Sequence, residues 1–101
     1  MRVFVLFDLP VESLENKRDY RKFRKHLIKS GFMMLQESVY CKLTLNQTAA
    51  KAIMSSVKKN APPEGNVKMM VITEKQFARM ETIVGDTSSS VIDSDKGLIV
   101  L

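Results

Sequence analysis

The chain has 101 residues, 45% hydrophobic and 27% charged, which is enough to bury the core of one small globular domain. Its apolar runs are far shorter than the about 20 residues of a membrane span, and its N-terminus lacks a secretory signal pattern. These features argue against membrane binding and predict a soluble cytoplasmic protein. Sixteen Lys and Arg against eleven Asp and Glu give a net charge of +5, which favours a polyanionic partner.

The N-terminal segment predicts a central strand that ends at an acidic residue. Residues 3–7 are an unbroken apolar run, typical of a strand that is covered on both faces. Pro10 cannot continue it, because proline lacks the backbone amide that pairing requires. Asp8 therefore follows a buried strand, a position that suits Mg²⁺ if a second carboxylate joins it. The alternative, which local sequence by itself favours, is that Asp8 bonds backbone amides of the following turn.

The next segment predicts a helix from about Leu14 to Ser30 that is apolar on one side and basic on the other. Ser13 is suited to begin this helix, and Gly31 is suited to end it. Tyr20, Phe23, Leu27 and the aliphatic stem of Arg24 share one side. The cationic residues that we expect to contact nucleic-acid phosphates are Arg18, Arg21, Lys22, Lys25 and Lys29. The alternative is a solvated helix face without a partner.

The middle of the chain predicts extended structure followed by a second helix. Residues 32–45 form a long extended stretch in which side chains alternate from Val39 to Leu45, and both a strand pair and a single bent strand fit this pattern. Asn46 is suited to cap a helix that runs to about Asn60. Its predicted narrow apolar face consists of Ala49, Ala52, Ile53, Ser56 and Val57.

The last third predicts a strand, a short helix and a final strand. Asn66 to Ile72 alternates apolar side chains on two faces. Thr73 and Gln76 form a capping-box pattern that predicts a helix over roughly residues 74–80. Residues 97–101 are again apolar and predict a C-terminal strand. We expect the short helix, loop and strand of residues 73–101 to contribute to a dimer contact.

This element order predicts one α+β domain over residues 1–101 with the ferredoxin-like βαββαβ fold. In that fold two helices cover one face of an antiparallel sheet, and here a C-terminal strand is added. The other face of the sheet is left bare. Because the first strand is apolar on both sides, a second copy that covers this face is the expected solution. The sequence thus predicts a homodimer.

Three motifs resemble a known family. They are Val5-Leu6-Phe7-Asp8-Leu9-Pro10, the basic Tyr20-Arg21-Lys22-Phe23-Arg24-Lys25, and Gln36-Glu37-Ser38-Val39-Tyr40. Together they resemble the small CRISPR-associated protein that accompanies the integrase when new spacers are acquired. Residues 73–80 resemble the branch of that family found beside single-effector nucleases.

The resemblance implies two functions from different classes. One is a homodimeric scaffold that holds prespacer duplex DNA between two integrase dimers. The other is a Mg²⁺-dependent endonuclease that cleaves RNA or DNA. In that case Asp8 from both protomers is the metal ligand and catalytic residue. The scaffold function draws on the fold, the dimer and the basic surface together, whereas the nuclease draws on Asp8 alone.

Overall fold

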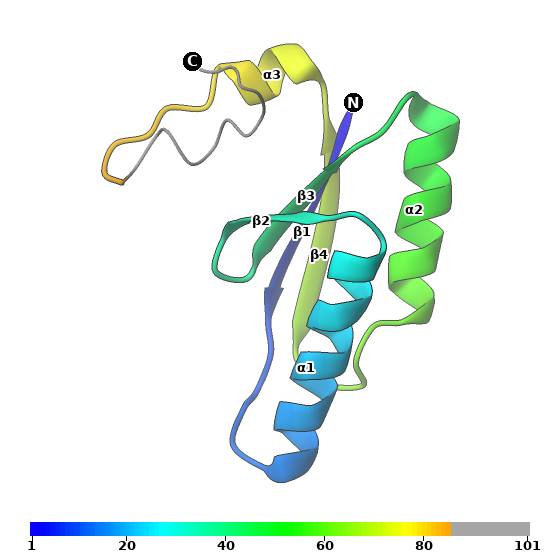
Figure 1. Ribbon diagram of the computed structural model, residues 1–101, viewed down its shortest axis with the longest axis vertical. Coiled ribbons are helices and arrows are strands. Elements are labelled where there is room, and N and C mark those ends of the chain that lie inside the picture. The colour runs from blue at the N-terminus through cyan, green and yellow to red at the C-terminus, as the bar shows by residue number, and fades with distance from the viewer. Residues whose placement is uncertain (86–101) are drawn as a thin grey trace.

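The computed structural model of the protein describes residues 1–85, which form four strands and three helices (Figure 1). The elements are β1 (Arg2–Asp8), α1 (Leu14–Lys29), β2 (Met33–Gln36), β3 (Val39–Leu43), α2 (Gln47–Lys59), β4 (Asn66–Ile72) and α3 (Glu74–Ala78). The first six follow the βαββαβ order, which confirms the predicted ferredoxin-like fold. The predicted C-terminal strand at residues 97–101 lies outside the described residues.

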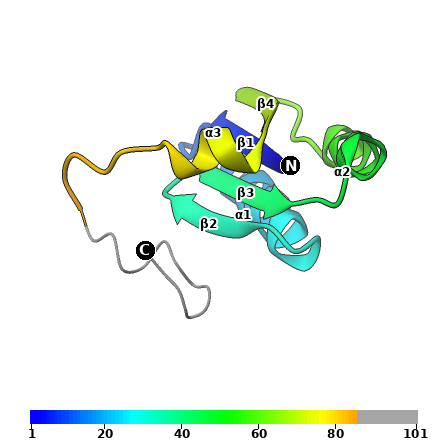
Figure 2. The same ribbon diagram turned by 90° about the horizontal axis from the view of Figure 1, so that it is seen from above.

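The four strands form one antiparallel sheet in the order β2-β3-β1-β4, as Figure 2 shows from above. Strand β1 is central, as its unbroken apolar sequence predicts. In the register, Val5 lies between Tyr40 of β3 and Met69 of β4. Because paired residues in antiparallel strands share a face, residues 3, 5 and 7 of β1 face one way and residues 2, 4, 6 and 8 face the other.

Helix α1 begins and ends with the residues that the sequence predicts. The Ser13 side chain accepts a hydrogen bond from the backbone N–H of Asn16 at 3.0 Å, and the Asn16 side chain accepts one from the Ser13 N–H. At the other end, Gly31 has φ +93° and the Phe32 N–H donates to the Leu27 carbonyl at 3.0 Å. Only glycine adopts this left-handed backbone at little cost, so Gly31 turns the chain back toward the sheet.

Residues 32–45 form a strand pair, which decides between the two structures that the sequence left open. The turn between β2 and β3 lies at Glu37 and Ser38, and Ser38 has φ 65°. A register shift between Met34 and Gln36 accompanies this turn. A serine at positive φ is not the usual hairpin signal, which is Asn-Gly or Asp-Gly, so the sequence pattern did not indicate the turn.

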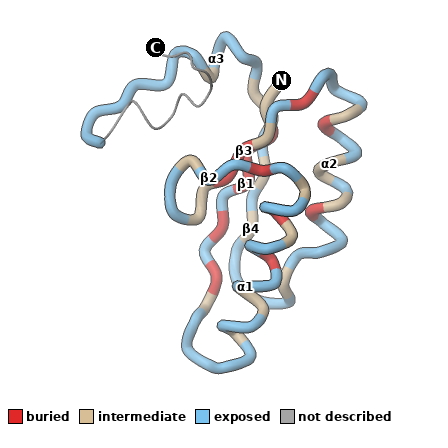
Figure 3. Tube along the Cα trace, in the orientation of Figure 1, coloured by how far each residue is buried: buried red, intermediate tan, exposed pale blue. Residues whose placement is uncertain are grey.

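The core lies between the sheet and the two long helices, where buried residues run along β1 and the inner sides of α1 and α2 (Figure 3). Val3, Val5 and Phe7 contribute from β1. The predicted apolar face of α2 was partly wrong, because Ala50 is fully buried whereas Ala52 is exposed. The helix packs through Ala50, Ile53 and Val57, and the small Ala50 side chain allows close approach to the sheet.

Helix α3 lies near the N-terminus at the top of Figure 1, on the face of the sheet that α1 and α2 leave uncovered. Its capping box is the predicted one, with Thr73 and Gln76 bonded reciprocally at 3.0 and 2.9 Å. It ends at Ala78, slightly earlier than predicted. No helix within residues 1–85 is long and apolar enough to cross a membrane.

Candidate nucleic-acid interface and open sheet face

The face of the sheet opposite α1 and α2 is mostly apolar and partly exposed, and we call it the open sheet face. Cross-strand register places on it Arg2, Phe4, Leu6, Asp8, Met33, Val39, Cys41, Leu43, Asn66, Lys68, Met70 and Ile72. Leu6, Leu43 and Met70 are 37%, 58% and 49% exposed. Adjacent apolar side chains that remain in water are typical of an interaction surface.

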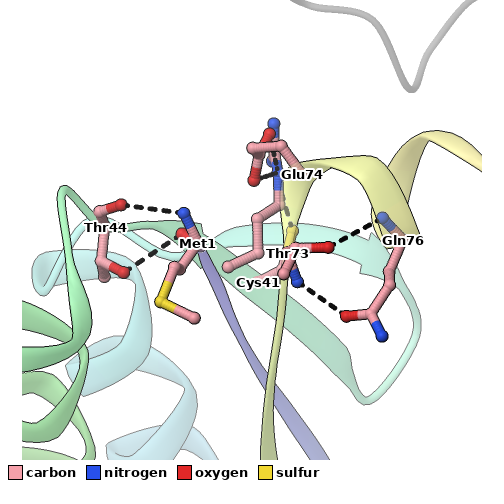
Figure 4. A network of polar contacts seen from close by, with 7 residues as sticks. Met1, Cys41, Thr44, Thr73, Glu74 and Gln76 are labelled. Atoms are coloured by element: carbon pink, nitrogen blue, oxygen red, sulfur yellow. Dashed lines mark hydrogen bonds and ion pairs between the residues drawn. The ribbon is translucent and has the colours of Figure 1, made fainter.

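Helix α3 closes one end of the open sheet face through the side chain of Arg2. The Arg2 guanidinium lies 4.0 Å from the Phe77 ring centroid and donates from Nε to both Glu74 carboxylate oxygens, at 3.1 and 3.0 Å. Beneath it, Phe4 packs against Phe77 with ring centroids 6.0 Å apart. Figure 4 shows Glu74 above Cys41, beside the capping residues of α3. These contacts fasten a five-residue helix to the sheet.

Cys41 lies under this end and is fully buried, where its free thiol packs as a small apolar side chain. Burial raises the pKa of the Cys41 thiol, because the thiolate would lose its hydration. The Arg2 guanidinium, whose Nη1 lies 3.9 Å from Sγ, opposes that rise. The neutral thiol is therefore the favoured form at neutral pH.

Asp8 lies at the other end of the open sheet face, exposed, and paired in register with Asn66. Gly65 has φ +98°, and a Cβ there would lie 2.8 Å from the Asp8 carbonyl oxygen. Glycine therefore lets the loop before β4 approach the end of β1. Within residues 1–85 the Asp8 carboxylate accepts no hydrogen bond from a protein group, so the turn-forming role that local sequence favoured is not seen. Among the described residues the carboxylate is therefore without a hydrogen-bond partner.

Residues 1–85 of one copy do not form a complete metal site around Asp8. No group of three or more His, Cys, Asp or Glu that could hold a metal occurs in the described part of the chain. Mg²⁺ is usually held by one or two carboxylates together with waters and substrate phosphates. The donor type therefore fits Mg²⁺, and in the hypothesis drawn from the sequence Asp8 of a second copy supplies the other carboxylate.

The outward side of α1 is strongly basic, and the sequence-predicted residues on it form the α1 basic surface. All of them are exposed: Arg18, Arg21, Lys22, Lys25 and Lys29. Among residues 1–85, the ion pair that the structure contains joins Arg2 to Glu74, remote from this surface in sequence. The five charges are thus not neutralised by neighbouring carboxylates and are available to an anionic partner.

Arg24 is a residue whose polar role sequence reasoning missed. Its Nε donates to the hydroxyl of Tyr40 on β3 at 2.8 Å, while the side chain as a whole stays exposed. This hydrogen bond is the main reason that the pKa of Arg24 is raised above its usual value. The sequence showed only that Arg24 borders the apolar side of the helix. A tyrosine sixteen residues away in the chain gave no local signal.

His26 occupies the seam between the two long helices. Its Nε2 lies 3.4 Å from the Ser56 hydroxyl on α2 and 3.5 Å from the Ser30 hydroxyl. No second histidine exists, and Cys41 lies on the other face of the sheet. This position gives His26 a structural role between the two helices.

The fold and the two surfaces define a class of protein: a small ferredoxin-like domain with one basic helix and one unpartnered sheet face. A family model described as "CRISPR associated protein Cas2" matches residues 1–80. The chain belongs to this family, in agreement with the resemblance found from its motifs.

Individual relatives support the assignment along the whole chain. A protein of Treponema denticola named "CRISPR-associated endoribonuclease Cas2" is 52% identical over 101 residues and is covered completely, as is this chain. A protein of Streptococcus mutans with the same name is 45% identical, with 100% of this chain and 93% of that protein covered. The crystal structure of Streptococcus pyogenes Cas2 has a TM-score of 0.62 at 18% identity, over 83% of this chain and 100% of that one, and supports the fold.

Proposed function

We propose that the protein is a nucleic-acid-binding subunit of the CRISPR adaptation machinery, which acts in the cytoplasm and holds prespacer duplex DNA. The observation that carries this proposal is the α1 basic surface, with five exposed cationic side chains that no described carboxylate neutralises. The helix contains seven Lys and Arg against two acidic residues. A charge imbalance of this size on one exposed helix is suited to a polyanion.

The spacing of these cations suits the backbone of a duplex. A helix of this length spans about 24 Å, and duplex DNA carries about one negative charge per 1.7 Å of axis. Successive cations in the row from Arg18 to Lys29 are about 5–6 Å apart. Such a row contacts phosphates without reading bases, so the expected binding is independent of sequence and strongly dependent on salt.

Assembly with other chains belongs to the same proposal. A homodimer that buries the open sheet face would cover Leu6 and Met70 and would double the basic surface available to DNA. Residues 73–101 follow β4 and are proposed to extend this contact. The integrase subunit is the proposed partner that carries out strand transfer, and the dimer would lie between two integrase dimers.

A charge-reversal experiment tests the DNA-holding function. The triple variant Arg18→Glu, Lys22→Glu and Lys25→Glu should abolish retention of duplex DNA and support of spacer integration, because it replaces three phosphate contacts by repulsion. The matched control is Lys51→Glu, Lys58→Glu and Lys59→Glu on α2, which makes the same change in net charge at exposed positions. Integration at the wild-type level by the α1 variant, or equal impairment of both variants, would contradict the proposal.

A second candidate function is a Mg²⁺-dependent endonuclease acting on RNA or DNA. The exposed Asp8 carboxylate favours it, and the relatives named above are called endoribonucleases. Asp8 from both protomers would hold the ion, which supplies an activated water and neutralises charge on the scissile phosphate. In this mechanism the role of the protein is to place two carboxylates on either side of the dimer axis.

Removal of one charged oxygen tests this candidate without disturbing the fold. Asp8→Asn should reduce cleavage to the level seen in EDTA, because a neutral amide is a poor Mg²⁺ ligand. Asp19→Asn on α1 is the matched control, since it makes the same change away from the open sheet face. Cleavage by highly purified Asp8→Asn at the wild-type rate would rule out Asp8 as the ligand.

A further inference from the structure

The hydrogen bond between Arg24 and Tyr40 joins the basic helix to the buried core. Arg24 is exposed on α1, whereas Tyr40 is 1% exposed on β3. The 2.8 Å hydrogen bond from Nε to the hydroxyl is the interaction that fixes the guanidinium. None of the five residues of the α1 basic surface has a comparable side-chain hydrogen bond with a described residue.

Core packing restricts the Tyr40 ring, and the hydrogen bond from Arg24 therefore restricts the guanidinium as well. The Tyr40 ring stacks on Phe7 with centroids 5.7 Å apart and an interplanar angle of 24°. Phe7 in turn packs edge-on against Phe23, with centroids 5.3 Å apart at 87°. Packed core rings of this kind have little rotational freedom. The hydroxyl is therefore a fixed point for a side chain that otherwise samples many rotamers.

The hydrogen bond leaves most of the guanidinium free for a ligand. Arginine has five N–H donors, and Tyr40 takes the one on Nε. Among residues 1–85, no further hydrogen bond or ion pair to Arg24 is present. The two Nη groups keep four donors at the exposed end. A planar fork of this kind matches two oxygens of one phosphate.

Arg24 also extends the basic area toward the sheet. Lys17, Arg21 and Arg24 follow i, i+4, i+7 spacing and so form a second row beside that of Arg18, Lys22 and Lys25. The bond to Tyr40 places this second row on the side of α1 that faces β3. His26, on the α2 side, contacts Ser56 instead.

We propose that Arg24 is a positioned phosphate-binding residue, whose guanidinium the Tyr40 hydroxyl holds ready to bind a backbone phosphate of the duplex through its two Nη groups. This inference rests on the proposed DNA-holding function. Fixing the side chain beforehand lowers the entropy cost of binding. The flexible lysines of α1 can then adjust around one fixed anchor.

The experiment measures the affinity of the full-length chain for a short labelled DNA duplex of mixed sequence, from about 50 to about 200 mM salt. Tyr40→Phe removes only the hydroxyl. It should weaken binding about two- to tenfold, the cost of ordering one long side chain, and leave the salt dependence unchanged. Tyr20→Phe is the matched control, because it deletes a hydroxyl from the same aromatic cluster, where Tyr20 packs on Phe7.

Two Arg24 variants separate charge from geometry. Arg24→Gln should reduce the steepness of log K against log salt by about 0.9 for each protomer that contacts the duplex, the value expected when one phosphate is no longer neutralised. Tyr40→Phe should then have no further effect in that background. Arg24→Lys keeps the charge but lacks the planar pair of Nη donors. It should therefore bind DNA more weakly, with the wild-type slope of log K against log salt.

The outcomes distinguish this inference from the function on which it rests. Tyr40→Phe binding as tightly as Tyr20→Phe, or an unchanged slope in Arg24→Gln, would overturn the role of Arg24. If the α1 triple reversal abolishes binding in the same assay, the DNA-holding function nevertheless survives. If the triple reversal binds DNA as tightly as wild type, the proposed DNA-holding function itself is contradicted.

Discussion

The outer side of α1 and the open sheet face lie on opposite sides of the same sheet. They differ in whether one chain supplies all the residues of the proposed binding site. The α1 basic surface has exposed charges that form no ion pair with any residue of the described range 1–85, and Arg24 is already hydrogen-bonded to Tyr40. The open sheet face presents apolar side chains, and its one carboxylate at Asp8 has no acidic partner in the register. The residues proposed to bind phosphates all lie in one copy, whereas the proposed metal site takes Asp8 from two copies.

This difference explains why the two candidate functions depend differently on assembly. Binding through separate phosphate contacts adds up residue by residue, so a monomer would retain weak affinity for DNA. A site divided across a dimer axis is incomplete in a monomer, because one copy supplies only one of the two proposed carboxylates. Disrupting the open sheet face should therefore weaken the first function and abolish the second.

The largest expected effect follows from a charge placed in the middle of the open sheet face. Leu6→Asp should produce a monomer, because a dimer interface would bury the carboxylate without a partner. Sedimentation should give half the wild-type mass, and DNA affinity should fall about 10²- to 10⁴-fold because bivalent binding is no longer possible.

Leu45→Asp provides the control, since Leu45 is 91% exposed beyond the end of β3. It should leave both mass and affinity unchanged. A Leu6→Asp protein that remains dimeric would show that the copies meet elsewhere and that the open sheet face is not the dimer interface.

Sequence patterns predicted most of the fold because its signals are local. The caps Ser13, Asn46 and Thr73 each lie next to the helix that they begin, and the apolar run of β1 marks a central strand by itself. Tertiary features were harder to predict. The buried face of α2 depends on how closely Ala50 approaches the sheet, and the turn at Ser38 uses a residue that rarely adopts positive φ.

The candidate site was predicted in its parts but not in its arrangement. The outward row on α1 follows from helical spacing alone. The bond from Arg24 to Tyr40 and the packing of Arg2 on Phe77 join residues 16 and 75 positions apart, which no window of sequence displays. Whether two Asp8 carboxylates meet depends on a second copy and stays a prediction.

A smaller effect is expected from loosening α3, which covers only one end of the open sheet face. Phe77→Ala removes the ring that packs on Phe4 and beneath Arg2. Because Phe77 is half-buried, the free energy of unfolding should fall by about 1–3 kcal/mol, less than for a fully buried phenylalanine. Cys41 should also react faster with iodoacetamide under native conditions.

Chemical denaturation and the rate of thiol labelling measure these two effects. Met80→Ala is a useful control, because Met80 is 51% exposed just beyond the end of α3. Unchanged labelling in Phe77→Ala would show that α3 does not protect Cys41, and that this end of the face is as open as the end at Asp8.

The smallest expected effect is the pH dependence that Cys41 gives to stability. Burial raises the pKa of the folded thiol, so the unfolded chain releases its proton first as the pH rises. The stabilisation is fully present below the unfolded pKa of about 8.5 and is lost as the pH rises from there through the folded pKa. The decrease is at most about 1.4 kcal/mol per pH unit.

Because other groups also titrate above about pH 8, the quantity to measure is the difference in unfolding free energy between wild type and Cys41→Ala. That difference should be constant from about pH 6 to pH 8 and should shift against the wild type at higher pH. A constant difference up to about pH 10 would mean that Cys41 is hydrated in the folded protein. The end of the open sheet face beneath α3 would then be accessible to water, as the end that carries Asp8 is.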